Sequence, residues 1–152
     1  MHSIEELLDL QRNHMRPSRD QINLRVAKVI AERSTCLRAQ VGAVITVDNR
    51  IVSTGYNGAT PGQDHCTDED CNSESHCSNS VHAEANAIAY AAKKGVAIEG
   101  GILYCTHSPC IKCTELIIQA GIKKVVYNKP YRATDFGLFN NAGVEINGED
   151  NL

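Results

Sequence analysis

The sequence predicts an α/β fold in which helices cover both faces of a single β-sheet. Between residues 40 and 54, two runs rich in β-branched residues flank the turn residues Asp48 and Asn49, which is the pattern of a β-hairpin. From residue 82 to residue 147, segments of helical periodicity alternate with short apolar strands. A chain of 152 residues without an internal repeat or linker fits one domain over residues 1–152.

Two helical segments precede the hairpin. Residues 1–16 carry apolar residues at helical spacing and end near Pro17, so we expect residues 1–17 to form a peripheral N-terminal extension and a candidate subunit contact. Ser18 is the expected N-cap of a second helix that runs to about Arg33 and covers the core.

The second half of the chain supplies the rest of the sheet and its helical layers. Gly95 and Gly121 follow two helical segments as C-terminal stops, because glycine adopts the left-handed conformation that ends many helices. The predicted strands span residues 40–47, 50–54, 101–106, 123–127 and 144–147, and the predicted helices of this half span residues 82–94, 110–120 and about 134–141.

Residues 59–80 interrupt the pattern with a Cys/His-rich insert. Proline, glycine, serine, asparagine and aspartate dominate there, and large aliphatic residues are absent. Such a segment cannot fold around a core of its own, so a bound metal ion is its expected support. The candidate ligands in it are His65, Cys66, Cys71, His76 and Cys77.

Charge and composition argue against several classes of function. The formal net charge is −3 and the basic residues are scattered, which argues against a nucleic-acid-binding surface. No apolar run is long enough to span a membrane, and the acidic N-terminus does not resemble a signal peptide. The seven cysteines are an odd number and crowd beside histidines or in Cys-x-x-Cys spacing, which favours metal ligation over disulfides. We therefore expect a cytoplasmic protein without nucleic-acid or membrane partners.

The strongest functional signal is one histidine followed by a pair of cysteines. His82, Cys110 and Cys113 offer three ligands suited to Zn²⁺, and Glu84 adds a carboxylate. Residues two apart on a helix point to nearly opposite sides, so His82 and Glu84 reach one site only from the first turn of a helix. Cys110 and Cys113 share a face at the start of another helix. We therefore expect two helix N-termini to converge on the metal, where their positive ends favour thiolates.

This arrangement predicts hydrolytic chemistry. Structural zinc sites use four protein ligands, whereas catalytic sites use three and keep one position open. Zinc lowers the pKa of bound water to about 7, and Glu84 is the catalytic residue that moves protons during attack on a carbon bearing an amino group. The pattern His-x-Glu … Pro-Cys-x-x-Cys is typical of zinc-dependent nucleobase deaminases. The alternative is a structural zinc knot in which Glu84 merely begins a helix.

Several segments carry a family resemblance over roughly residues 18–147. They are residues 33–36, 40–45, 55–58, 82–88, 108–113 and 119–124. Together they resemble deoxycytidylate (dCMP) deaminases of the phage and bacterial type, within the cytidine deaminase superfamily. The zinc motif marks the superfamily, and the Gly-Tyr-Asn-Gly loop with the cysteine-rich insert narrows the resemblance. It implies a five-stranded mixed sheet in a three-layer sandwich and zinc-dependent hydrolysis of dCMP to dUMP and ammonia, which feeds thymidylate synthesis.

The resemblance also implies which residues contact the substrate. Asn57 matches a loop asparagine that contacts the sugar, and Tyr131 matches a tyrosine near the pyrimidine ring and phosphate. Ala83 and Ser108, beside the metal ligands, are further substrate-binding candidates. No motif assigns the phosphate, and we take Arg38 as its candidate. The other arginines near the pocket segments are Arg33 and Arg132. The alternatives are a left-handed turn role for Asn57 and ordinary packing for Tyr131.

Regulation, assembly and a second metal follow from the resemblance alone. The family is typically a homohexamer activated by dCTP and inhibited by dTTP, which bind with Mg²⁺ at a second nucleotide site. The residues similar to part of that site are Asn57, Gly58, Ala59 and Gly62. The insert resembles one that holds a structural zinc in part of the family. Its candidate ligands are Cys36 and Cys66, with the remainder drawn from Cys71, His76 and Cys77.

Other functions are weighed against this one. A zinc deaminase acting on cytidine, or on a base in tRNA or single-stranded DNA, shares the motif, but the acidic balance weakens the nucleic-acid version. A non-catalytic zinc-binding module would not need Glu84 or an open metal position.

Two further residues have no part in the predicted metal site. Cys105 lies in an apolar strand and is expected to be a small core residue. His107 stands beside the metal loop, where relatives commonly carry a hydrophobic residue.

Overall fold

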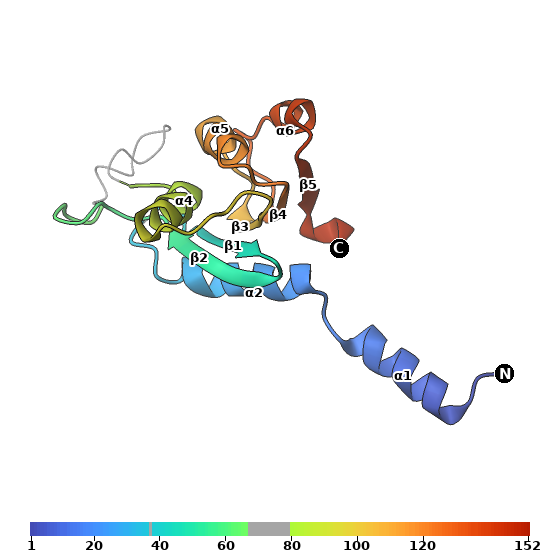
Figure 1. Cartoon of the computed structure of the whole chain (residues 1–152). Coiled ribbons are helices and arrows are strands. Elements are labelled where there is room, and N and C mark those ends of the chain that lie inside the picture. The colour runs from blue at the N-terminus through green and yellow to red at the C-terminus, as the bar shows by residue number, and fades with distance from the viewer. Residues whose placement is uncertain (37, 67–79) are drawn as a thin grey trace.

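The computed structural model describes residues 1–36, 38–66 and 80–152 and contains a five-stranded mixed sheet (Figure 1). The strands are β1 (Gly42–Val47), β2 (Arg50–Tyr56), β3 (Ile102–His107), β4 (Lys124–Lys129) and β5 (Glu145–Gly148). Their order is β2-β1-β3-β4-β5, with antiparallel pairs β1–β2 and β1–β3 and parallel pairs β3–β4 and β4–β5. The predicted α/β fold with one five-stranded mixed sheet is confirmed.

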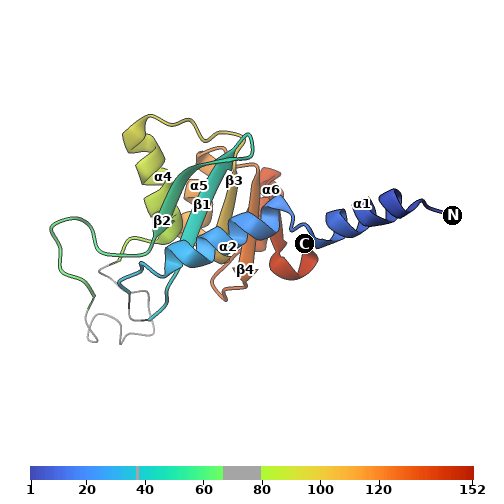
Figure 2. The same cartoon turned by 90° about the horizontal axis from the view of Figure 1, so that it is seen from below.

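Helices cover both faces of this sheet (Figure 1, Figure 2). The α-helices in the described residues are α1 (Ile4–Met15), α2 (Arg19–Ala31), α4 (Ala83–Lys94), α5 (Ile111–Gln119) and α6 (Phe136–Ala142), followed by the short 3₁₀ helix η1 (Glu149–Asn151). α2 lies on one face, and α4, α5 and α6 lie on the other. The three layers expected from the resemblance are present, and η1 is an element that the sequence patterns did not predict.

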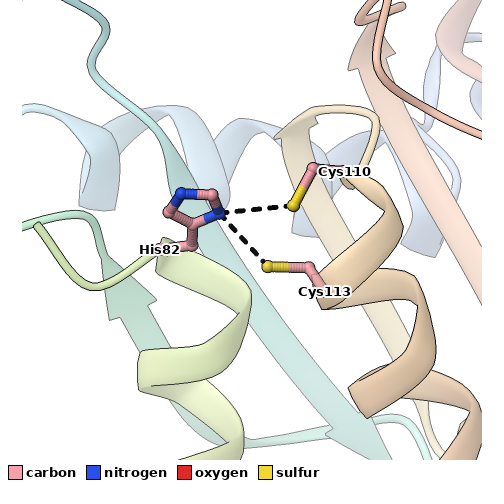
Figure 3. Close-up of side chains that lie close together, drawn as sticks. All are labelled: His82, Cys110 and Cys113. Carbon is pink, nitrogen blue, oxygen red and sulfur yellow. Dashed lines mark hydrogen bonds between the residues drawn. The ribbon is translucent and has the colours of Figure 1, made fainter. Parts of the chain in front are cut away.

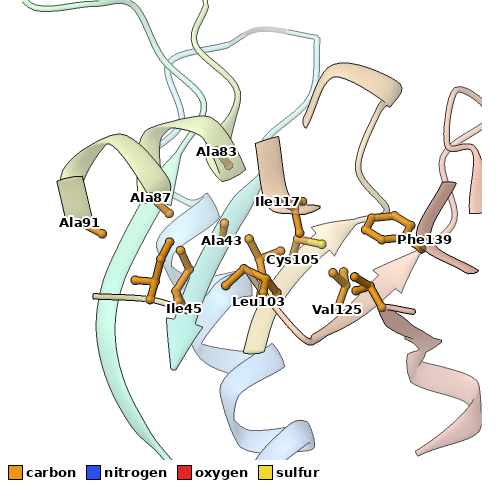
Figure 4. Packing of buried hydrophobic residues seen from close by; sticks show 13 residues of the cluster. Ala43, Ile45, Ala83, Ala87, Ala91, Leu103, Cys105, Ile117, Val125 and Phe139 are labelled. Atoms are coloured by element: carbon orange, nitrogen blue, oxygen red, sulfur yellow. The ribbon is translucent and has the colours of Figure 1, made fainter. Parts of the chain in front are cut away.

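Two apolar clusters fill the space between the layers. The cluster under α2 includes Leu24 and Tyr104, which have almost no solvent exposure. The cluster under α4, α5 and α6 is larger and includes Ile117, Phe139 and Cys105 (Figure 4). Burial raises the pKa of the Cys105 thiol well above its usual range, so this cysteine is a neutral core residue, as predicted.

Glycines set how closely the helical layers approach the sheet. A Cβ at Gly42 would overlap the carbonyl oxygen of Ala27 in α2, and a Cβ at Gly55 would overlap the carbonyl oxygen of Ala83 in α4. Such close approach of two backbones is possible only where no side chain intervenes. Gly55 therefore places the first turn of α4 directly against β2.

The hairpin and its continuation define where the insert begins. Asp48 and Asn49 have φ values of 51° and 64°, the pair of left-handed residues that a type I′ turn requires. β2 continues to Tyr56, two residues beyond its predicted end, because its pairing with β1 extends that far. An isolated bridge between Gly58 and Val81, with N···O distances of 3.2 and 2.8 Å, then brings the two ends of the insert together.

α1 extends away from the sheet and its helical layers (Figure 1, Figure 2). Ser3 and Glu6 form a capping box at its start, with hydrogen bonds of 3.2 and 2.8 Å. Its Ile4 and Leu7 side chains are exposed. Of the helices in the described ranges, none combines the length and the apolar character that a membrane crossing requires.

Asp20 ties α2 to two strands of the sheet. Its Oδ1 accepts a hydrogen bond from the Tyr104 hydroxyl at 2.7 Å, and its Oδ2 accepts one from the Lys124 ammonium at 2.8 Å. Burial by itself raises the pKa of Asp20, but the hydrogen bonds from Lys124 and Tyr104 outweigh burial, and the pKa is lowered. Burial and then the bond to Asp20 raise the pKa of Tyr104 to about 12. At neutral pH the bridge therefore joins an ionised carboxylate to a neutral phenol and an ammonium.

Tyr104→Phe should destabilise the fold by about 2 kcal/mol at neutral pH, because it removes a partly buried hydrogen bond to a charged group. The folded pKa of Asp20 lies below the unfolded value of about 3.9. Its stabilisation is therefore present above the unfolded pKa and is lost as the pH falls through the folded pKa. Urea unfolding at neutral and strongly acidic pH measures both effects, with Tyr90→Phe at an exposed tyrosine as the control. Equal stability of Tyr104→Phe and the wild type at neutral pH would contradict this role.

Candidate active site

Side chains from the starts of α4 and α5 converge beside the sheet (Figure 3). His82 is the N-cap of α4 and Cys110 is the N-cap of α5, and neither side chain makes a capping hydrogen bond. His82 Nδ1 lies 3.5 Å from Cys110 Sγ and 3.3 Å from Cys113 Sγ. The ligand atoms of these three residues lie within 4.8 Å of one another, and no other such group of His, Cys, Asp or Glu occurs in the described ranges. One nitrogen and two sulfurs form a donor set that suits Zn²⁺.

The acidities of the two thiols in this group depend on each other and on His82. The hydrogen bond with Cys113 has the largest influence on Cys110 and, with the bond to His82, lowers the pKa of Cys110 to about 3 despite burial. The hydrogen bond to Cys110, and then burial, raise the pKa of Cys113. The pKa of His82 is raised as well, mainly by its bond to Cys110. The group therefore holds a thiolate that attracts a cation, and a divalent cation would replace the proton shared between the sulfurs.

Glu84 lies in the first turn of α4 with only 4% of its surface exposed. Burial is the main cause that raises the pKa of its carboxyl group. A carboxylate that merely began a helix would face solvent, whereas Glu84 lines the same pocket as His82 and Cys110. A buried carboxyl group with a raised pKa beside metal-ligand side chains has the properties of a general acid and base.

The pocket brings together most of the residues that the sequence singled out. Besides His82, Glu84 and Cys110, its wall contains the substrate-binding candidates Arg38, Asn57, Ala83, Ser108 and Tyr131. Cys113 is buried and does not belong to the described wall. The effector-site candidates outside that wall are Gly58, Ala59 and Gly62, and the arginines outside it are Arg33 and Arg132.

Asn57 is buried and braces one side of the pocket. Its Oδ1 accepts a hydrogen bond from the Val41 N–H at 2.8 Å, and its Nδ2 donates to the Ala39 carbonyl at 2.7 Å. Its own carbonyl accepts a hydrogen bond from the Ser34 hydroxyl at 2.9 Å. These bonds hold the segment that carries Arg38 and leave one Nδ2 hydrogen and one Oδ1 lone pair for a ligand. Asn57 does not have a positive φ, so the left-handed turn role does not apply.

Two polar residues of the pocket wall, His107 and Ser80, were not assigned a role from the sequence. His107 Nδ1 lies 3.0 Å from Thr106 Oγ1, which accepts a hydrogen bond from the Gly42 N–H. Burial, together with the charge of Lys129, lowers the pKa of His107, which favours a neutral ring. Ser80 Oγ is buried without a hydrogen-bond partner among the described residues. Ser80 ends the insert, whose lack of periodicity gives no signal for the direction of a side chain.

The second group of metal-ligand candidates is described only in part. Cys36 and Cys66 are both buried, each with 7% of its surface exposed, and Cys36 also lines the pocket. His65, next to Cys66, is exposed. The other candidates, Cys71, His76 and Cys77, lie outside the described residues.

Comparison with known proteins identifies the family. Residues 17–129 match the family described as the cytidine and deoxycytidylate deaminase zinc-binding region. The chain belongs to this deaminase family. The matched range includes the metal-ligand group and Glu84, and the family resemblance predicted from the sequence is confirmed.

The deaminase has relatives in bacteria and phages. It is 44% identical to ComE operon protein 2 of Bacillus subtilis over 134 residues, which is 86% of this chain and 71% of that protein. It is 33% identical to the deoxycytidylate deaminase of Enterobacteria phage T4 over 165 residues, with coverage of 81% of this chain and 86% of the phage protein. Among solved structures, it is similar to the dCMP deaminase of cyanophage S-TIM5 in complex with dCMP and dUMP, with a TM-score of 0.79 and 35% identity over 89% of this chain and 99% of that chain.

Proposed function

We propose that this deaminase hydrolyses dCMP to dUMP and ammonia in the cytoplasm and so supplies thymidylate synthesis. The observation that carries the proposal is the group of His82, Cys110 and Cys113, two of which line a pocket together with the buried Glu84. The names of relatives support the substrate, since several are deoxycytidylate deaminases. A similar phage enzyme has also been solved with dCMP and dUMP.

The three side chains suit a zinc ion as its protein ligands. Their donor atoms lie within 4.8 Å of one another, and hydrogen bonds with Cys113 and His82 lower the pKa of the Cys110 thiol, which favours the thiolate that zinc binds. His82, Cys110 and Cys113 would hold the ion. Three protein ligands are the number that catalytic zinc sites use. When bound, zinc supplies Lewis-acid activation of water at neutral pH.

Glu84 is the proposed proton carrier. Its carboxylate accepts a proton from the attacking water and delivers it to N3 of the cytosine ring. Once the water oxygen is bonded to C4, Glu84 takes the second proton from this new hydroxyl group and passes it to the amino nitrogen. The C–N bond then breaks, C4 becomes a carbonyl and ammonia leaves. The raised pKa of Glu84 suits both directions of transfer, because a carboxyl group of ordinary pKa holds a proton poorly at neutral pH.

The pocket wall is the proposed nucleotide-binding surface. Asn57 would contact the sugar through the Nδ2 hydrogen that its structural bonds leave over. Tyr131 would lie near the pyrimidine ring and phosphate, and Arg38, which is exposed, would supply a positive charge to the phosphate. Ala83 and Ser108 flank the metal-ligand residues and complete the wall.

Glu84→Gln should keep its zinc and lower kcat for dCMP by about 10²- to 10⁴-fold, because the amide cannot carry the proton. Glu115→Gln is the matched control, since Glu115 is exposed on α5 and pairs only loosely with Lys112 at 3.6 Å. Ammonia release and metal analysis of the same preparations give both quantities. A near-normal rate for Glu84→Gln would refute its role.

We also propose a second, structural zinc that is held by Cys36 and Cys66, with further ligands from Cys71, His76 and Cys77. Burial of the first two thiols supports it. Metal analysis should then find two zinc ions per chain. His82→Ala should remove one ion and Cys36→Ser the other, because each substitution deletes a ligand. A single zinc ion in the wild type would rule out the second site.

Regulation and assembly are proposed from the family resemblance. The proposed site for dCTP or dTTP with Mg²⁺ lies where the end of β2 leads into the insert and consists of Asn57, Gly58, Ala59 and Gly62. The exposed apolar side chains of α1 support a contact with a second copy in a homohexamer. Light scattering should give the mass of six chains, and dCTP should raise and dTTP lower the rate with dCMP. A monomer whose rate responds to neither nucleotide would contradict this proposal.

A further inference from the structure

Ser108 joins the end of β3 to the segment that follows β4. Its backbone N–H donates a hydrogen bond to the Lys129 carbonyl at 2.9 Å, which continues the parallel ladder between the strands. Pro130, which follows Lys129, has no backbone N–H and therefore cannot extend this ladder of hydrogen bonds. The Ser108 side chain provides the connection at this point, because its Oγ accepts a hydrogen bond from the Tyr131 N–H at 2.6 Å.

Thr134 completes the same connection. Ser108 Oγ and Thr134 Oγ1 are hydrogen-bonded at 2.7 Å, and the Thr134 N–H donates to the Tyr131 carbonyl at 3.1 Å. Tyr131 is therefore held through both its N–H and its carbonyl group. Ser108 is only 2% exposed, so water competes little for these bonds. Two partners also use most of the hydrogen-bonding capacity of a serine hydroxyl.

We propose that Ser108 is a positioning residue that holds Tyr131 in the wall of the pocket. Tyr131 lines this pocket together with Glu84 and His82. Because Ser108 precedes Cys110 by two residues, one short stretch carries both a metal-ligand candidate and the anchor of the tyrosine. The position of Tyr131 relative to the reacting group is thus set by β3. The inference rests on the proposed function in one respect, namely that the molecule bound beside Tyr131 is a nucleotide.

The kinetic test separates positioning from general stability. Ser108→Ala should raise KM for dCMP about three- to tenfold, the effect of one lost hydrogen bond, with little change in kcat. In a Tyr131→Ala background the same substitution should change KM by less than about twofold, because the positioned group is gone. Thr134→Val should have a smaller effect than Ser108→Ala, because it leaves the bond from Tyr131 to Ser108 in place.

Amide exchange gives a readout that does not depend on activity. Ser108→Ala should increase hydrogen exchange in residues 130–135, since the Tyr131 N–H loses its acceptor. Ser53→Ala is the matched control, because Ser53 is also buried and donates to the Ala87 carbonyl at 2.6 Å. That control removes a serine hydroxyl of the same kind and should leave exchange in residues 130–135 unchanged. If Ser108→Ala does not fold, Thr134→Val serves for the same measurement and should also increase exchange there.

Unchanged exchange in residues 130–135 would overturn the inference. An increase in KM that is equal in the wild-type and Tyr131→Ala backgrounds would overturn it as well, since Ser108 would then act independently of the tyrosine. A wild-type protein that releases no ammonia from dCMP would defeat the proposed function instead. The exchange measurement would still decide whether Ser108 anchors Tyr131.

Discussion

The contact between Gly55 and the first turn of α4 is the constraint on which the site depends. Because β2 has no side chain at this position, the Ala83 carbonyl approaches the strand closely and the start of α4 is fixed. His82 then points from that start toward α5, which begins soon after β3 ends (Figure 3). Two helix N-termini meet near the carboxyl end of the central strand β3, so the metal-ligand group is held by rigid elements.

This packing also shifts the pKa values of two groups that meet there, Glu84 and Cys110. Glu84 enters the site from the first turn of α4, and its burial raises the pKa of its carboxyl group. Cys110 enters from the start of α5, where hydrogen bonds with Cys113 and His82 lower its pKa to about 3. One end of the pocket therefore combines a proton carrier with an anionic ligand group.

Most of the fold and the metal-ligand group could be predicted, because each helix and strand, and each helix start that carries a ligand, has its own local sequence pattern. The spacing of His82 and Glu84 makes sense only in the first turn of a helix, and that is where α4 places them. The partners of polar side chains could not be predicted, because tertiary packing decides them. The side-chain amide of Asn57 is hydrogen-bonded to the backbone at Ala39 and Val41. The Ser108 hydroxyl is hydrogen-bonded to the backbone of Tyr131, 23 residues away. Spacing along the chain carries no signal for either contact.

Ammonia release from dCMP, compared with deoxycytidine, cytidine, dCTP and a single-stranded oligonucleotide, tests the central claim most directly. The zinc-loaded protein should convert dCMP to dUMP and release one ammonia for each dUMP formed. The other four compounds should react much more slowly, because the pocket is proposed to recognise a nucleoside monophosphate. No release from dCMP by zinc-loaded protein, or faster release from cytidine or the oligonucleotide, would contradict the account.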